Sequence, residues 1–319
     1  MSEPPPAAPS SIAILGPGGV GGLLAGALAR AGARVTTVAR AETASAIARD
    51  GVHVESVLLG DFVARPAAVE RLTEPVDVLL VSTKAAGLDA ALARVEAAPR
   101  LVVPLLNGLD HMTPLRERFG GDAVVGTIRV ESDRVAPGHV VQTSRFLLVE
   151  LASDDPAPHP RLAALAELLE GAGIPARVRE REAQALWGKL VRLNALACMT
   201  TAYDLPLGAI REDLELRAQL DACVAEGAAV ARTDGAEIDP AAVHEEVDRI
   251  HEGFTSSMQR DVAAGREPEL DAIAGAVLRA GARHGIACPT IAGLAARIAA
   301  RAGMQAAPDI WQAAHSIQF

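Results

Sequence analysis

The first part of the chain alternates short apolar runs with stretches of helical periodicity. Four of these runs, which we interpret as strands, cover residues 11–15, 34–38, 76–81 and 101–106. Runs that are continuously apolar are typical of parallel strands covered on both faces. Strands that alternate with helices therefore predict a Rossmann-type α/β domain for this half of the chain.

The pattern changes after residue 121, where strands alternate with turns. We expect later, partly antiparallel strands to complete the same sheet over residues 123–130, 138–143 and 144–151. Pro137-Gly138 is a turn signal between the first two of these strands. A helix over residues 160–171 and a last strand over 174–178 follow, so the domain 11–179 is predicted to end near Arg179.

The remaining residues, 180–319, have helical periodicity throughout and predict a separate all-α domain. Its first helix covers residues 180–206 and carries one lysine, Lys189, among apolar side chains. Later helices are expected to stop at Pro206, Gly208, Gly235, Pro240, Gly265, Gly285 and Pro289. The predicted fold class is thus an α/β Rossmann-type dinucleotide-binding domain followed by an all-α helical domain.

A glycine-rich turn joins the first strand to the first helix. The residues Gly16, Gly18, Gly19, Val20 and Gly21 belong to the stretch GPGGVG, a GxGxxG pattern. In this pattern the first glycine permits a tight turn, the second lets the backbone approach a pyrophosphate, and the third lets the helix pack closely. The free N–H groups of the helix N-terminus favour an anion. This context between a strand and a helix predicts nucleotide binding, whereas an isolated Gly-rich turn would not.

The end of the second strand indicates which dinucleotide binds. The position where NAD-dependent enzymes place an acidic residue for the ribose hydroxyls is Ala39, and Arg40 follows it. A missing carboxylate removes repulsion toward a 2′-phosphate, and an arginine can bind that phosphate with two hydrogen bonds. We therefore expect NADP(H). The alternative is that Arg40 is an ordinary exposed arginine that opens the next helix.

Polar residues follow two further strands. Lys84 ends the stretch Ser82-Thr83-Lys84, and Asn107 follows the strand over 101–106. Ligands of open α/β sheets bind beyond the carboxyl ends of strands. Lys84 and Asn107 are therefore candidates for a cofactor phosphate and for a substrate next to the nicotinamide, although each alone could be a loop residue that caps a helix.

The helical half supplies the ionisable candidates. The Lys189 amine costs free energy to remove from water unless a partner or a function compensates. Pro268 is expected at the first position of a helix, which places Glu269 in the first turn, where the helix dipole favours the carboxylate. Taken alone, Glu269 would be an ordinary helix-start glutamate.

Composition excludes several classes of protein. A net charge of −10 argues against a nucleic-acid partner, since phosphates require a basic face. The three cysteines have no metal-ligand spacing and cannot all pair, which favours a reducing compartment, buried thiols and no metal site. Residues 1–10 are Pro-rich and are interpreted as a disordered tail without a targeting signal. No apolar run reaches the roughly 20 residues of a membrane span, so we expect a soluble cytoplasmic protein.

These motifs together resemble the ketopantoate reductase family (2-dehydropantoate 2-reductase) over nearly the whole chain. The matching stretches are GPGGVG, the strand end with Arg40, STK, LNG, LWGKL and SSMQRDVAAGREPELDAIAGAVLRAGARHGIACP. The resemblance implies a Rossmann-type domain, an all-helical domain and reduction of a 2-keto acid by NADPH. It implies that Arg40 and Lys84 hold NADPH, that Lys189 is the proton donor, that Glu269 is a catalytic carboxylate, and that Ser257 and Asn107 contact substrate.

One departure from the family pattern concerns the substrate. Family members that reduce ketopantoate usually carry asparagines four and eight residues after the lysine, where this chain has Leu193 and Ala197. Asn194 lies five residues after Lys189, roughly 140° around an ideal helix. Either a local bulge makes Asn194 a substrate contact, or the pocket is more apolar than usual and takes a less polar keto acid.

Two alternatives remain at this point. A non-catalytic NADP(H)-binding sensor would keep the fold without the reaction, although the presence of Lys189, Ser257 and Glu269 argues against it. The apolar helices over residues 214–231 and 277–299 have more apolar positions than one buried face needs. They could carry a homodimer contact or bury each other.

Overall fold

The computed structural model describes residues 9–304, which divide into two compact units. Unit 1 runs to Leu106 and continues over His111–Ala185, and unit 2 holds Asn107–Asp110 and the chain from Leu186 onward. The boundary thus falls a few residues after the predicted Arg179. The sequence analysis also missed that a short segment of the first half belongs to the second unit.

Ser10, the last residue of the predicted tail, is held by hydrogen bonds. Of the residues 1–10 expected to form that tail, 1–8 lie outside the described residues. Ser10, in contrast, donates hydrogen bonds from its N–H and its hydroxyl to Asp77 Oδ2, at 2.8 and 2.7 Å. Ser10 is therefore held against the start of β6 (Val78–Val81) through Asp77.

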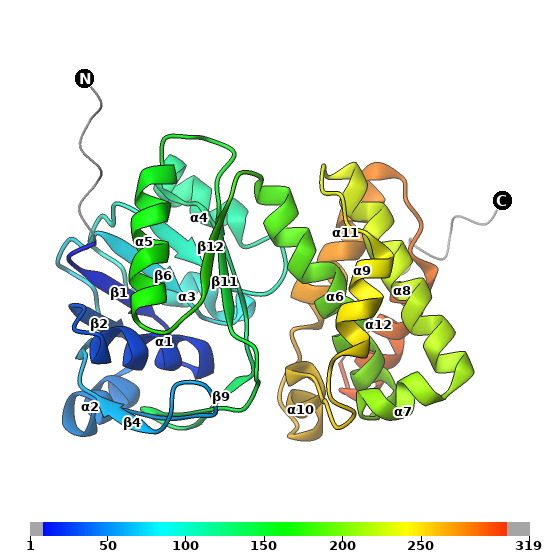
Figure 1. The fold of residues 1–319 in the computed structure, drawn as a ribbon, viewed down its shortest axis with the longest axis horizontal. Helices are drawn as coiled ribbons and strands as arrows, with labels where there is room; N and C mark the ends of the chain where they lie inside the picture. The colour runs from blue at the N-terminus through cyan, green and yellow to red at the C-terminus, as the bar shows by residue number, and fades with distance from the viewer. Residues whose placement is uncertain (1–8, 305–319) are drawn as a thin grey trace. The chain divides into compact units, whose positions relative to one another are not determined.

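Unit 1 is built on a five-stranded parallel sheet (Figure 1) with the strand order β5-β2-β1-β6-β7. Its strands are β1 (Ile12–Leu15), β2 (Val35–Val38), β5 (Ala67–Val69), β6 (Val78–Val81) and β7 (Val102–Pro104). Leu15 on β1 is aligned with the last residues of both neighbours, Val38 and Val81. The carboxyl ends of the three central strands therefore lie at one edge, as the sequence predicted.

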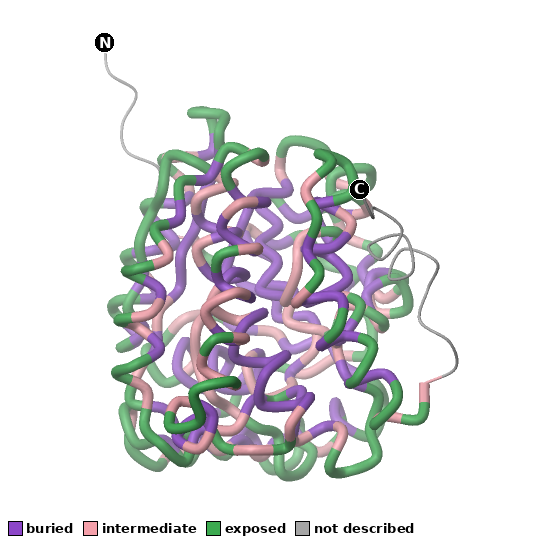
Figure 2. Tube along the Cα trace, turned by 90° about the vertical axis from the view of Figure 1, so that its right-hand side faces the viewer, coloured by how far each residue is buried: buried purple, intermediate pink, exposed green. Residues whose placement is uncertain are grey.

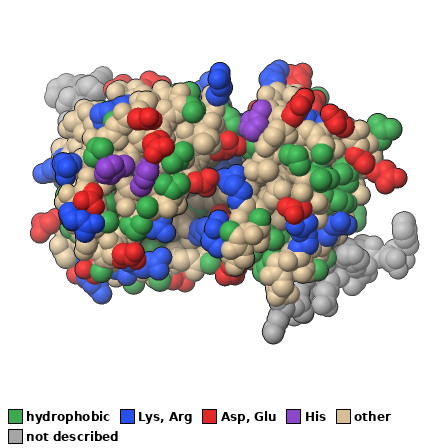
Figure 3. Space-filling model, turned by 90° about the horizontal axis from the view of Figure 1, so that it is seen from below, with side chains coloured by type: hydrophobic (Ala, Val, Ile, Leu, Met, Phe, Trp, Pro, Cys, Tyr) green, Lys and Arg blue, Asp and Glu red, His purple; other side chains and the backbone are tan. Residues whose placement is uncertain are grey.

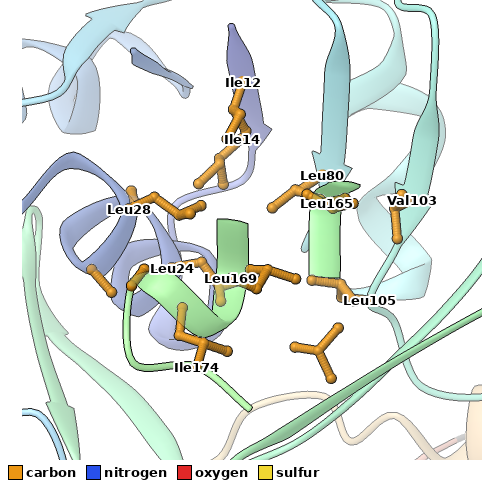
Figure 4. Packing of buried hydrophobic residues seen from close by; sticks show 14 of the residues in the cluster. Ile12, Ile14, Leu24, Leu28, Leu80, Val103, Leu105, Leu165, Leu169 and Ile174 are labelled. Atoms are coloured by element: carbon orange, nitrogen blue, oxygen red, sulfur yellow. The ribbon is translucent and has the colours of Figure 1, made fainter. Parts of the chain in front are cut away.

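Both faces of this sheet are buried. Alternate residues of β1 point to opposite sides, so that Ile12 and Ile14 join one apolar cluster and Ala13 and Leu15 the other. The first cluster includes leucines of α1 (Gly19–Arg30) and α5 (His159–Gly171), and Figure 4 shows them packed against the sheet. The second cluster includes leucines of α3 (Leu88–Leu92) and α4 (Met112–Phe119). This double cover explains why the strand sequences are continuously apolar.

The later strands correct one prediction, because they do not complete the parallel sheet. Two of them, β9 and β10, join the earlier β3 and β4 in a four-stranded sheet with the order β4-β3-β10-β9. The others form a three-stranded sheet with the order β12-β11-β8. The bounds are β3 (Val52–Ser56), β4 (Phe62–Ala64), β8 (Val125–Arg129), β9 (Ser132–Ala136), β10 (His139–Gln142), β11 (Leu148–Ala152) and β12 (Ala176–Arg179). The Pro137-Gly138 turn is present between β9 and β10, with Gly138 at a φ of 74°.

Short elements complete unit 1. The helix α2 (Ala41–Asp50) follows β2, and the 3-10 turns η1 (Ala85–Gly87) and η2 (Gly120–Asp122) follow β6 and α4. Strands β3, β4 and β5 fall in a region for which the sequence analysis predicted no strand. β3 nevertheless alternates buried and exposed residues, the pattern of a strand with one solvent-facing side.

Unit 2 is helical, as predicted. Its helices are α6 (Glu182–Tyr203), whose first residues belong to unit 1, α7 (Leu207–Glu212), α8 (Leu214–Thr233), α9 (Pro240–Asp248), α10 (Ser257–Ala263), the π-helix η3 (Asp271–Gly275), α11 (Ala276–His284) and α12 (Pro289–Arg301). Figure 2 shows buried and exposed positions alternating along these helices, as amphipathic helices require.

Side-chain caps explain where several of these helices begin. Asp213 accepts hydrogen bonds from the first-turn N–H groups of α8, and Asp239 and Ser256 do the same for α9 and α10. Gly285 ends α11 in the left-handed conformation. Gly208 is an exception among the predicted stops, since it lies inside α7. In the described part of the chain, no helix combines the length and the apolar character that crossing a membrane would require.

Candidate functional site

The glycine-rich turn after β1 is held by hydrogen bonds on both sides. Gly16 has a φ of 87°, which favours glycine, and its N–H donates to Val38 O at 3.0 Å. The Ser82 hydroxyl donates to Gly16 O at 2.9 Å, and Gly18 N–H donates to the same oxygen at 2.7 Å. The turn is therefore held in place by its neighbouring strands.

Each glycine of the turn has a distinct steric role. A Cβ on Gly21 would overlap Ser82 Oγ and Gly16 O, and a Cβ on Gly19 would overlap the backbone carbonyl oxygen of Ser132. A Cβ on Gly18, in contrast, would meet no atom within 4 Å. Gly21 and Gly19 thus permit close packing inside unit 1, whereas Gly18 leaves open space in front of α1.

The N-terminus of α1 suits a diphosphate. No side chain caps this helix, and its first turn contains no acidic residue. The N–H groups of Gly19, Val20 and Gly21 have no acceptor within the helix, because the first turn precedes the hydrogen-bond ladder. Uncapped donors, the helix dipole and the open space at Gly18 together fit the pyrophosphate of a dinucleotide.

The basic candidates of unit 1 lie at the same edge of the sheet. Ala39 is buried, and Arg40 is exposed at the N-cap position of α2, which also has no side-chain cap. Lys84 is exposed at the start of η1, after β6. Because β2, β1 and β6 end in register, Arg40 and Lys84 flank the glycine-rich turn along this edge.

Lys189 of unit 2 is buried, with 8% of its surface exposed. It lies on α6 next to the buried side chains of Trp187 and Leu190. The Trp187 indole N–H donates to Asp234 Oδ2 at 3.1 Å, and this bond anchors that turn of α6. A lysine with so little exposure in an apolar setting is uncommon and is characteristic of functional sites.

Asn107 and Glu269 are hydrogen-bonded within unit 2. Asn107 Nδ2 donates to Glu269 Oε2 at 3.0 Å, and both residues are half-buried. Gly108 follows with a φ of 87° and packs so closely on Ala272 that a Cβ would overlap the Ala272 carbonyl oxygen. Two sequence candidates that are 162 positions apart are therefore brought together.

The helix beside Glu269 differs from the prediction. Glu269 lies just before the helix, which starts at Leu270 rather than at Pro268, and the next residues, Asp271–Gly275, form a π-helix. Single π-helical turns occur frequently at functional sites. Glu269 is thus adjacent to the helix N-terminus without belonging to its first turn.

Ser257 is exposed at the first position of α10. The preceding residue, Ser256, is buried and caps this helix by accepting a hydrogen bond from Gln259 N–H at 3.1 Å. Thr200 of α6 donates its hydroxyl proton to Ser256 Oγ at 2.8 Å. The α10 N-terminus, and with it Ser257, is therefore fixed to the C-terminal half of the helix that carries Lys189.

Asn194 is the candidate that the structure contradicts. Its exposed fraction is 0%, its amide donates to Cys223 Sγ at 3.3 Å, and Cys198 Sγ donates to its carbonyl oxygen at 3.4 Å. Burial raises the pKa of the Cys198 thiol to about 12, so this thiol stays protonated and remains a donor. Asn194 is thus a core residue and not a substrate contact, because no bulge turns it toward the face of Lys189.

Several residues that shape these sites were missed by the sequence analysis. Ser132 Oγ donates to Gly19 O at 2.8 Å, and Ser82 fixes Gly16, as described above. Ser82 precedes Lys84 in a stretch already singled out, but nothing in the sequence links Ser132 to the glycine turn. Among the described residues, no group of three or more His, Cys, Asp or Glu side chains could hold a metal ion. The three cysteines are free and buried.

Charged side chains of both signs lie on the surface. On the face shown in Figure 3, acidic and basic side chains are interspersed, and no broad basic surface is visible on that face. A phosphate backbone binds to continuous basic surfaces. An anionic ligand must therefore be recognised by a few local groups.

Comparison with known proteins gives a consistent result. Residues 12–150 match the family described as ketopantoate reductase PanE/ApbA, and residues 183–302 match its C-terminal part. The chain is 31% identical to the 2-dehydropantoate 2-reductase of Caulobacter vibrioides over 303 residues, which are 92% of this chain and 99% of that protein. It is 32% identical to the Mycobacterium tuberculosis (strain H37Rv) 2-dehydropantoate 2-reductase over 287 residues, covering 88% of this chain and 94% of that protein.

Solved structures agree with this match. The 2-dehydropantoate 2-reductase of Geobacter metallireducens GS-15 has a TM-score of 0.83 at 27% identity and covers 90% of this chain and 98% of its own. A D-mandelate dehydrogenase in complex with NADH and anilino(oxo)acetate also has a TM-score of 0.83, with 92% of this chain and 98% of that chain covered. Its identity of 23% shows the shared fold alone.

Proposed function

Because this chain belongs to the ketopantoate reductase family, we propose that it reduces 2-dehydropantoate (ketopantoate) to pantoate with NADPH. Family membership makes it an oxidoreductase that acts on a CH–OH group with NADP(H). The observation that carries the proposal is the hydrogen bond between Asn107 and Glu269 in the same unit as the buried Lys189. These are the groups that reduction of a keto acid requires.

Lys189 is the proposed proton donor. When bound, NADPH supplies the hydride that the carbonyl carbon of the keto acid receives. The Lys189 ammonium stabilises the negative charge that grows on the carbonyl oxygen and then transfers a proton to that oxygen. Its low exposure strengthens this interaction, because water does not screen the charge.

Glu269 is the proposed carboxylate of the site. Its Oε2 accepts the hydrogen bond from Asn107, which restricts the orientation of the carboxylate. Its Oε1 is the oxygen that we propose to accept a hydrogen bond from the hydroxyl group of the substrate or product. Ser257, exposed at the start of α10, is the proposed hydroxyl contact for the same substrate.

Arg40 and Lys84 are the proposed determinants of cofactor choice. Both are exposed, and they follow β2 and β6 at the edge that holds the glycine turn. An arginine binds a phosphate monoester with two parallel hydrogen bonds, and a buried alanine at position 39 offers no carboxylate to repel it. This arrangement favours NADPH over NADH.

Substrate-dependent oxidation of NADPH tests the proposal. Purified protein is mixed with ketopantoate and NADPH, the absorbance of NADPH is followed, and the rates are compared with those for NADH. We expect turnover with ketopantoate and a kcat/KM at least about tenfold higher for NADPH, equivalent to about 1.4 kcal/mol. Absence of NADPH oxidation with ketopantoate would refute this substrate.

A second candidate substrate is a 2-keto acid with a less polar side chain. Leu193 and Ala197 stand at the positions one and two turns after Lys189, and Asn194 is turned into the core. An apolar lining favours an apolar substrate group by about 0.8 kcal/mol for each methylene buried. A panel of keto acids of increasing apolar size separates the two candidates, since a higher kcat/KM for any of them than for ketopantoate would reverse the order.

Oligomeric state and location stay predictions. Most apolar residues of α8 and α12 are buried, but Leu214 at the start of α8 is 87% exposed. We propose a homodimer that uses this part of the chain, which size-exclusion chromatography coupled to light scattering would test. We also propose a location in the cytoplasm, in line with three free cysteines.

A further inference from the structure

We propose that Arg279 is a positioning residue that holds the segment 107–110 and thereby orients Asn107 toward Glu269. The inference rests on the proposed function, because it concerns how that site is kept in shape. It assigns a role to a residue that touches neither Lys189 nor Glu269 in the hydrogen bonds and ion pairs described here.

Arg279 joins two carboxylates in unit 2. Its guanidinium donates to Asp110 Oδ2 from Nε at 3.0 Å and from the NH2 nitrogen at 2.6 Å. The NH1 nitrogen also donates to Asp271 Oδ1 at 2.6 Å, and the NH2 nitrogen donates to the Asp271 carbonyl oxygen at 2.9 Å. Asp110 is distant in sequence from α11, whereas Asp271 lies in the π-helix that leads into α11. The arginine therefore ties a loop to a helix.

In these ion pairs the arginine side chain is less exposed to solvent than the two aspartate side chains. The Arg279 side chain is 23% exposed, whereas those of Asp110 and Asp271 are 48% and 62% exposed. Burial alone would lower the pKa of Arg279, but hydrogen bonds to Asp271 and Asp110 outweigh it and hold that pKa above its ordinary value. The guanidinium therefore stays charged at neutral pH and can hold both carboxylates.

Gly275 makes room for this arrangement. It lies between Asp271 and Arg279 on one face of the helix, each four residues apart. A Cβ on Gly275 would lie 2.7 Å from Asp271 Oδ1 and 3.0 Å from the NH1 nitrogen of Arg279. The absence of a side chain lets the arginine lie along the helix and reach the loop.

The segment 107–110 is thus fixed at both ends. Asn107 is bound to Glu269 at one end, Asp110 is bound to Arg279 at the other, and Gly108 packs on Ala272 between them. Asn107 and Asp110 are three residues apart, and Gly108 between them is packed against backbone, so a shift of Asp110 reaches Asn107 through a short stretch of chain. Loss of the Arg279 connection should therefore loosen Asn107, and the cost should fall on substrate orientation rather than on cofactor binding.

The test compares Arg279→Gln with Arg279→Lys and with the matched control Arg249→Gln. Arg249 follows α9 in the same unit, its side chain is 73% exposed, and its NH2 nitrogen lies 2.8 Å from Glu245 Oε2. Each change is made in the wild-type chain and in an Asn107→Ala background, and KM, kcat and the Kd of NADPH are measured. Hydrogen–deuterium exchange of the peptide over residues 105–112 is recorded for the same proteins.

We expect Arg279→Gln to raise KM for the keto acid about tenfold and to change the Kd of NADPH by less than about twofold. Arg279→Lys keeps one ion pair and should give an intermediate KM, and Arg249→Gln should match the wild type. In the Asn107→Ala background the effect of Arg279→Gln should shrink to less than about twofold, because the group it positions is gone. Equal effects in both backgrounds would indicate a merely structural arginine and overturn the proposal.

The exchange measurement keeps this inference separate from the proposed function. If the wild type reduces none of the keto acids, the proposed function fails, and exchange over 105–112 still reports whether Arg279 holds the segment. Faster exchange in Arg279→Gln, but not in Arg249→Gln, supports the connection. Unchanged exchange in Arg279→Gln overturns it whatever the activity.

Discussion

Replacement of Gly108 by alanine is the sharpest single test of how the site is built. The φ of 87° at this position is one that residues with a Cβ rarely adopt. The added Cβ would overlap the Ala272 carbonyl oxygen and lie 3.0 Å from the Ala272 carbonyl carbon. The Ala272 atoms that the new Cβ would meet are backbone atoms of the π-helix. They cannot move aside as the end of a flexible side chain could.

The size of the effect follows from two terms. The left-handed conformation costs about 1–2 kcal/mol for a residue with a Cβ. Restoring ordinary van der Waals contact with Ala272 requires a displacement of about 1 Å, enough to break a hydrogen bond that starts at 3.0 Å between Asn107 and Glu269. A misplacement of this size costs up to about 100-fold in rate, so we expect kcat/KM to fall between about 10-fold and 100-fold.

The assay is steady-state oxidation of NADPH by the keto acid, combined with thermal unfolding and with NADPH binding followed by fluorescence. Gly32→Ala is the matched control, because Gly32 has a φ of 90°, close to that of Gly108, but a Cβ there would meet no atom within 4 Å. The control therefore carries the conformational cost without the overlap. We expect both variants to lose similar stability from the backbone term and only Gly108→Ala to lose kcat/KM, with the Kd of NADPH unchanged in each.

The reasoning would be refuted by a Gly108→Ala protein whose kcat/KM stays within about twofold of the Gly32→Ala value. Such a result would mean that the loop adapts without displacing Asn107, or that the contact between Asn107 and Glu269 does not matter for the reaction.

Further predictions concern the remaining groups. Lys189→Met should lower kcat by about 100-fold to 10,000-fold and leave the Kd of NADPH nearly unchanged, as measured by steady-state rates and fluorescence titration. Arg40→Gln should weaken the binding of NADPH by about tenfold relative to the binding of NADH. An unchanged preference for NADPH over NADH in binding titrations would contradict the role assigned to Arg40. Gly18→Ala should keep the unfolding temperature, since the new Cβ meets no atom, yet raise the Kd of NADPH because the methyl group occupies the space in front of α1. A hydrogen bond from the Ser10 side chain, together with others, lowers the pKa of Asp77 below its ordinary value, so its stabilisation is full above the ordinary carboxyl pKa and is lost as pH falls through the lowered pKa. Asp77→Asn should therefore reduce the unfolding temperature at neutral pH, and melting curves of the two proteins should converge in acid.

Much of the first unit could be predicted because its signals are local. The strand over 12–15, the glycine turn and the helix that follows are specified by neighbouring residues, and the structure has them within a residue or two. The end of β2 at Val38 likewise placed Arg40 correctly at the start of α2. The family assignment, which excludes a purely non-catalytic sensor, followed from motifs of the same local kind.

The errors concern contacts between residues distant in sequence. The sequences of the strands after residue 122 do not indicate which strand each one pairs with. In the structure β10 pairs with β3 and β11 pairs with β12, so these strands belong to two separate sheets. The angle of Asn194 on an isolated helix leaves room for a bulge toward Lys189, whereas in the structure its amide contacts the thiols of Cys223 and Cys198. The π-helix near Glu269 has no sequence signature of its own.

The segment 107–110 has a consequence for protein engineering and for recombination between relatives. It is encoded within the first half of the gene but folds with the second unit. A chimera that joins two homologues near residue 185 would combine this segment from one parent with Glu269, Ala272 and Arg279 from the other. Such hybrids should retain activity only when the segment from one parent still fits those three residues of the other. A crossover near residue 185 therefore separates residues that contact each other, although it lies at the boundary between the units.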